Sequence, residues 1–101
     1  MNTKGHYIAS SAEFWSSGAS GDWSFMPDGD VAATYILIHL PVDSGANIAV
    51  LPIRQPPPDA QSQAWWGWNG STEAPSLTPS ILHHSVPAWH GYMTDGELIS
   101  V

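Results

Sequence analysis

Cysteine is absent from this sequence of 101 residues, and strongly cationic side chains are almost absent. Without cysteine the chain can form neither disulfides nor thiolate metal sites, and it has no thiol nucleophile, which fits a reducing compartment. Lys4 and Arg54 are the only lysine and arginine against nine Asp and Glu, which gives a formal net charge of −7. Two cations cannot supply the phosphate contacts that nucleic-acid binding needs, so we expect no direct nucleic-acid partner.

Long apolar runs are also missing. The longest stretch, from Val31 to Leu40, is interrupted by Thr34 and His39 and is about half as long as a membrane-spanning helix. The first fifteen residues contain no apolar run behind basic residues, so no signal peptide is expected. These features predict a soluble intracellular protein with no membrane partner.

Glycine and proline, by contrast, are frequent, with nine of each, and they break the chain too often for long helices. We therefore predict an all-β or β-rich α+β fold: a small single-domain antiparallel sheet or sandwich over residues 1–101 with at most one short helix. The helix is expected around Ser11 to Ser17, with Ser10 or Ser11 as its cap.

Two apolar segments in the first half of the chain are typical of paired strands. Residues 31–42 are rich in β-branched and aromatic side chains and predict a central strand covered on both faces. Residues 46–54 predict its antiparallel partner, in which Pro52 favours an edge position. The proline-rich residues 54–64 are interpreted as a stiff internal connection, because each half of the chain is too small to fold alone.

The tryptophans are concentrated in "WWGWNG", residues 65–70, where three of the six occur. If this stretch is extended, alternation directs Trp66 and Trp68 to one face and Trp65 to the other. We predict that Trp66 and Trp68 pack in the core and that Trp65 is the ring available for stacking on a ligand. Asn-Gly at 69–70 and Asp-Gly at 95–96 predict turns, the second within a closing hairpin.

Three histidines, His83, His84 and His90, lie within eight residues of one another. Neighbouring strand residues face opposite sides, so one of His83 and His84 can meet His90 across a turn near residues 85–87. Asp95, or His39 from the predicted central strand, would add a further ligand, and His84, His90 and Asp95 are the candidate site for zinc or iron. The spacing matches no strong metal signature, so structural, hydrogen-bonded histidines remain the alternative.

Serine and carboxylate side chains in the same region give weaker indications of catalysis. Ser76, Ser80 and Ser85 are close to histidines in sequence, but none occupies a G-x-S-x-G motif, so a serine nucleophile is not favoured. Asp95 and Glu97 fit a hairpin turn and a solvated strand better than acid–base catalysis. The sequence therefore assigns no catalytic residue.

Three motifs in residues 65–101 resemble a known family. They are "WGWNG" at 66–70, "EAPSLTPSI" at 73–81 and "WHGYMTDGE" at 89–97. Together they resemble the DUF6527-like family of small bacteriophage and prophage proteins, whose members are sometimes mislabelled ammonia monooxygenase. Some relatives carry a cysteine beside the histidine that aligns with His90, where this chain has Trp89.

The resemblance implies a small phage-encoded accessory protein that acts in the cytoplasm of the bacterial host and antagonises a host defence system. Such a binding protein would be non-enzymatic and would either cover a host protein surface or sequester a nucleotide-derived signal. The pocket for that signal would be lined, in a monomer or between subunits of a homo-oligomer, by Trp65, Trp89, His83, His84 and His90. The alternative function is a zinc- or iron-dependent enzyme that uses the C-terminal His and Asp cluster.

Overall fold

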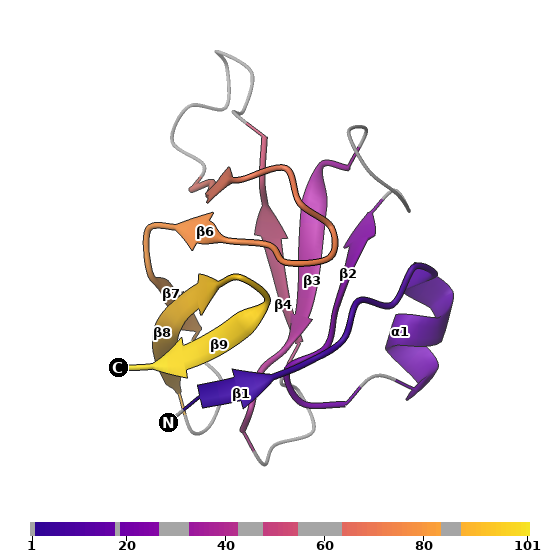
Figure 1. Cartoon of the computed structure of the whole chain (residues 1–101), viewed down its shortest axis with the longest axis horizontal. Coiled ribbons are helices and arrows are strands. Elements are labelled where there is room, and N and C mark those ends of the chain that lie inside the picture. The colour runs from indigo at the N-terminus through magenta and orange to yellow at the C-terminus, as the bar shows by residue number, and fades with distance from the viewer. Residues whose placement is uncertain (1, 18, 27–32, 43–47, 55–63, 84–87) are drawn as a thin grey trace.

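The computed structural model describes residues 2–17, 19–26, 33–42, 48–54, 64–83 and 88–101. Within these ranges the chain forms antiparallel sheets and one short helix, so the β-rich prediction is confirmed (Figure 1). The elements are β1 (Asn2–Lys4), α1 (Ser11–Ser17), β2 (Trp23–Met26), β3 (Tyr35–His39), β4 (Ile48–Pro52), β5 (Gly67–Trp68), β6 (Leu77–Thr78), β7 (Ile81–His83), β8 (Trp89–Thr94) and β9 (Glu97–Ser100).

The first sheet has the order β2-β3-β4, with β3 in the centre. Ile36, Leu37 and Ile38 of β3 are fully buried, which explains why this strand is nearly continuously apolar. The antiparallel partner predicted over residues 46–54 is observed as β4, residues 48–52, and Pro52 lies on this strand at the edge of the described sheet.

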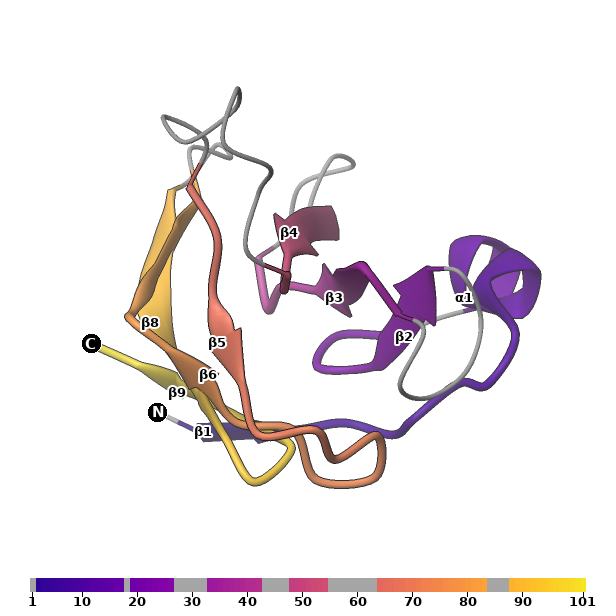
Figure 2. The same cartoon turned by 90° about the horizontal axis from the view of Figure 1, so that it is seen from above.

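Helix α1 lies beside β2, at one edge of this sheet (Figure 2). Ser10 caps the helix, because its Oγ accepts a hydrogen bond of 3.3 Å from the backbone N–H of Glu13. Phe14 is fully buried, and its ring packs at 4.4 Å from that of His39 on β3. In the described ranges no helix has the length and apolarity required to cross a membrane.

The second sheet has the order β1-β9-β8-β7. The β8–β9 hairpin turns at Asp95 and Gly96, whose φ angles of 50° and 77° lie in the left-handed region that Asp-Gly turns use. The predicted closing hairpin is therefore confirmed. The inner face of β8 and β9 contributes Trp89, Met93 and Leu98 to the hydrophobic core that this sheet shares with the first.

The β5–β6 pair joins the two larger sheets, and β5 runs between β4 and β8 in Figure 2. Trp66 makes the connection directly, because its backbone N–H donates to Pro52 O of β4 at 2.9 Å. Trp66 and Trp68 both pack partly buried against the core, whereas Trp65 is 42% exposed. This distribution is the one that strand alternation predicts.

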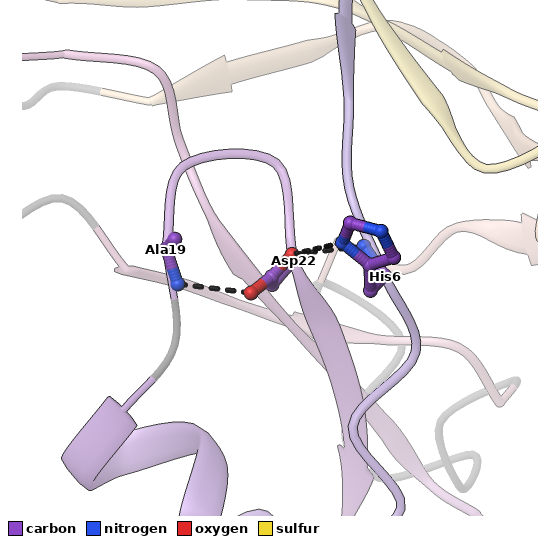
Figure 3. A network of polar contacts seen from close by, with 3 residues as sticks. All are labelled: His6, Ala19 and Asp22. Atoms are coloured by element: carbon purple, nitrogen blue, oxygen red, sulfur yellow. Dashed lines mark hydrogen bonds and ion pairs between the residues drawn. The ribbon is translucent and has the colours of Figure 1, made fainter.

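The N-terminal segment, residues 2–8, contacts both sheets. Strand β1 pairs with β9, and further along the segment Tyr7 forms a parallel bridge with Trp23 of β2. The carboxylate of Asp22 holds the segment in place and is buried, with 8% of the residue exposed. It accepts hydrogen bonds from His6 N at 2.8 Å and Ala19 N at 2.9 Å, one on each oxygen (Figure 3).

Replacing Asp22 with alanine is expected to lower the free energy of unfolding by about 2–4 kcal/mol, because two backbone N–H groups lose a charged acceptor. Chemical denaturation measures this loss. His6→Ala is the matched control. The His6 side chain is 90% exposed, and its Nδ1 lies 3.6 Å from Asp22 Oδ1, so removing the side chain should lower the free energy of unfolding by less than about 0.5 kcal/mol. Equal losses of stability in the two variants would contradict the role of the Asp22 carboxylate as the acceptor that holds the N-terminal segment.

Candidate active site

Two adjacent strands place a serine and a histidine together on the outer face of the second sheet. In the β7–β8 register, Leu82 lies opposite His90 and Ile81 opposite Gly91. Burial alternates along β8, so that His90 and Tyr92 are exposed, whereas Trp89, Gly91 and Met93 are buried. Ser80 directly precedes β7 on the same face as Leu82, which puts it diagonally across from His90.

The contact between these two side chains is direct. His90 Nε2 lies 3.1 Å from Ser80 Oγ, within the range of a good hydrogen bond. With the ring proton on Nδ1, Nε2 accepts the hydrogen bond that the Ser80 hydroxyl donates. This is the arrangement in which a histidine withdraws a proton from an attacking serine oxygen.

Neighbouring elements fix the backbone on both sides of the pair. Trp66 Nε1 donates to Ser80 O at 3.2 Å, and the next residue, Ile81, is fully buried. His90 lies in β8, which has strands on both sides, and its carbonyl oxygen accepts a hydrogen bond from Val101 N at 3.0 Å. The serine and the histidine are therefore held by different parts of the fold.

In the part of the chain that the structure describes, no carboxylate contacts His90, so the site consists of a Ser–His dyad there. A dyad can supply both nucleophile and general base, while orientation of the imidazole comes from the strand that carries it.

A second serine, Ser76, has a different environment. Its Oγ accepts from Asp95 N at 2.9 Å and donates to Asp95 Oδ1 at 3.4 Å. Nearby, Gly96 N donates to Pro75 O at 2.9 Å. Asn69 completes the connection, because its Oδ1 accepts from Ser76 N at 3.1 Å. Ser76 and Asn69 therefore fasten the loop before β6 to the β8–β9 turn and have an architectural role.

The residues predicted to line a ligand pocket are distributed over both faces of the second sheet. His83 pairs with Trp89, which is 5% exposed and donates through Nε1 to Ser100 Oγ at 3.1 Å. Because side chains alternate along each strand, His83 and Trp89 lie on the inner face of the sheet and His90 lies on the outer face. Trp65 is exposed on the segment before β5, and His84 lies outside the described residues.

The predicted metal ligands are His84, His90 and Asp95. His90 lies on the outer face of β8 and Asp95 at the turn that ends this strand. The described ranges contain no group of three or more His, Cys, Asp or Glu side chains placed to hold a metal ion. Because His84 is outside those ranges, the zinc or iron site stays a prediction.

Ser80 lacks a G-x-S-x-G motif, so the sequence alone does not favour it as a nucleophile. That motif belongs to one strand–turn–helix arrangement, whereas here the serine directly precedes β7, which is at the edge of its sheet among the described strands. The available signal was the predicted turn near residues 85–87. A hairpin centred on residue 86 places Leu82 opposite His90, and the diagonal neighbour on the same face is Ser80.

A serine hydroxyl hydrogen-bonded to a histidine is the pairing that serine hydrolases use. The chain belongs to the family described as bacterial ubiquitination-like system serine protease (BubE), whose family model matches residues 32–101. The match includes both Ser80 and His90. No curated protein and no solved structure matches the chain significantly.

This membership corrects the prediction of a DUF6527-like phage family. The prediction of a phage-encoded antagonist of host defence is wrong for the same reason, because the family description refers to a bacterial ubiquitination-like system. Four residues of the motifs, Asn69, Ser76, Asp95 and Gly96, build turns and fasten a loop. The same motifs contain Ser80 and His90, whose contact depends on the β7–β8 register and is not visible in the motifs themselves.

Proposed function

We propose that this chain is a serine protease in which Ser80 is the nucleophile and His90 the general base, acting on a polypeptide within a bacterial ubiquitination-like system. The observation that carries the proposal is the 3.1 Å separation of His90 Nε2 and Ser80 Oγ. The family description supports the same reaction class.

In the proposed reaction Ser80 Oγ attacks the carbonyl carbon of the scissile peptide bond and forms a new C–O bond. The hydroxyl proton passes to His90 Nε2, which then donates it to the nitrogen of the leaving amine as the C–N bond breaks. Water attacks the resulting ester carbonyl, transferring a proton to His90, and the proton returns to Ser80 Oγ when the acid product leaves. Each group is regenerated, so no further reactant besides water is required.

The exposure of the dyad fits a macromolecular substrate. His90 projects from the outer face of a sheet, and Ser80 is half-buried beside it. A polypeptide segment can approach this face without entering an enclosed cavity. The imidazole must be neutral to accept the serine proton.

A fluorophosphonate probe tests the proposal, because such probes form a stable bond with activated serine hydroxyls. We expect one adduct per chain, located by peptide mass spectrometry on the peptide that contains Ser80. His90→Gln should slow the labelling by about 10²-fold or more, since the general base is lost while a polar side chain of similar size remains.

Two variants control for indirect effects. Ser76→Ala removes a serine hydroxyl that contacts Asp95, and His6→Ala removes an exposed histidine elsewhere; both should label at the rate of the unmodified chain. Labelling that is distributed over several serines, or that persists at full rate in His90→Gln, would refute the assignment.

A further inference from the structure

We infer that Leu82 and Tyr92 form an apolar subsite beside the dyad, which binds an aliphatic or aromatic side chain on the acyl side of the scissile bond. The inference rests on the proposed function, because it concerns the specificity of that reaction. It names the substrate class as an extended peptide segment with an apolar residue at the point of cleavage.

Both residues are large, apolar and open to solvent. Leu82 is 56% exposed and Tyr92 is 45% exposed, although each lies in the middle of a sheet strand. Adjacent exposed apolar side chains give a surface that an apolar group of a ligand can cover.

Their position relative to the dyad follows from the strand register. Leu82 is directly opposite His90, and Tyr92 is the next outward-facing residue along β8. Continuing the pairing of Ile81 with Gly91 by one residue sets Ser80 across from Tyr92. Ser80 and His90 therefore alternate with the two apolar side chains on one patch of the sheet.

The patch formed by Leu82 and Tyr92 contacts the acyl side of the substrate. During the reaction the acyl group becomes bonded to Ser80 Oγ, so the side chain next to that carbonyl is the substrate side chain held nearest to Ser80. The strand register places the apolar side chains of Leu82 and Tyr92 on the same face, next to Ser80 and His90. Covering them removes apolar area from water, which favours apolar substrate residues.

The backbone of β7 can hold the substrate main chain. His90 O accepts from Val101 N, so the His90 carbonyl is directed toward β9. In an antiparallel ladder the opposite residue, Leu82, then forms a non-hydrogen-bonded pair, and its own N–H and C=O point away from β8. Among the described strands β7 is at the edge, so these groups face the side on which an extended peptide can pair.

Charge near the site disfavours acidic substrate residues. Neither β7 nor β8 contains a lysine or arginine, and the turn that follows β8 carries Asp95. An acidic side chain at the cleavage point would find no cation on these strands and would add to the repulsion from a chain with formal charge −7.

Four diphenyl aminoalkylphosphonates, which are mechanism-based serine probes, test the inference when their side chains correspond to Leu, Ala, Lys and Glu. We expect Ser80 to be modified by the Leu probe about 10-fold faster than by the Ala probe, and slowest by the Glu probe. Leu82→Ala should slow the Leu probe by about 10-fold and the Ala probe by less than about 3-fold.

Val50→Ala is the matched control, because Val50 is another exposed apolar strand residue, 44% exposed on β4, and its removal should change neither rate. Tyr92→Ala provides a second variant with the same expected selectivity loss. Modification of Ser80 at equal rates by all four probes would overturn the subsite while supporting the nucleophile. Absence of any Ser80 adduct would overturn the proposed function, and the subsite with it.

Discussion

Ser80→Ala should lower kcat/KM for peptide hydrolysis by about 10³-fold or more, because removing Oγ eliminates the atom that bonds to the substrate carbonyl. The variant should remain folded, with a free energy of unfolding within about 1 kcal/mol of the unmodified chain, since the backbone contacts of Ser80 do not depend on its hydroxyl. Hydrolysis of a peptide with a leucine at the cleavage point, followed by mass spectrometry, measures the loss.

A double-variant cycle distinguishes a dyad from two independent contributions. His90→Ala alone should reduce kcat/KM by about 10²–10⁴-fold, and adding it to Ser80→Ala should cause little further loss, because the base has no proton to accept once the hydroxyl is gone. Multiplicative losses in the double variant would mean that the two side chains act separately. If the Ser80→Ala variant kept its full activity, Ser80 could not be the nucleophile.

Gly5→Ala is the substitution expected to damage the fold most. A Cβ added at residue 5 would lie 1.9 Å from Gly21 O and 2.1 Å from Gly21 C, so two backbone segments would have to separate. Separation would also disturb the adjacent hydrogen bond from His6 N to Asp22. We expect a loss of more than about 3 kcal/mol in the free energy of unfolding, measured by denaturant titration.

Gly70→Ala is the control for the change from glycine to alanine itself. Gly70 has φ of 84°, which is unfavourable for alanine, but a Cβ there meets no atom within 4 Å. Its cost should be limited to about 1–2 kcal/mol of backbone strain. If Gly5→Ala were no more destabilising than Gly70→Ala, close approach of the two backbones would not be the reason for glycine at residue 5.

Much of the fold can be predicted from local sequence because the determining signals are local. The continuous apolar run predicts β3, the serine before Ala12 and Glu13 predicts the start of α1, and Asp95-Gly96 predicts the last hairpin. Strand β1 is different. Its sequence, Asn-Thr-Lys, carries no apolar alternation, and its pairing with β9 at the other end of the chain is set by long-range packing.

The candidate site was harder to predict because it depends on register. Ser80 and His90 come into contact only through the pairing of β7 with β8, and a shift by one residue would direct them to opposite faces. Residue types alone gave the histidine cluster more weight than the isolated serine. The alternation of side chains along a strand correctly separated the exposed Trp65 from the partly buried Trp66 and Trp68. This prediction needs only the two-residue period of a strand and no knowledge of the partner strand.

The family match begins at residue 32, whereas the structure uses residues before it to complete both larger sheets. Strand β1 covers the outer edge of β9, and β2 covers that of β3. A chain shortened to residues 32–101 would leave both edges with unpaired backbone groups, which are templates for pairing with other molecules. Such a fragment should be recovered as insoluble aggregate even though it retains Ser80 and His90.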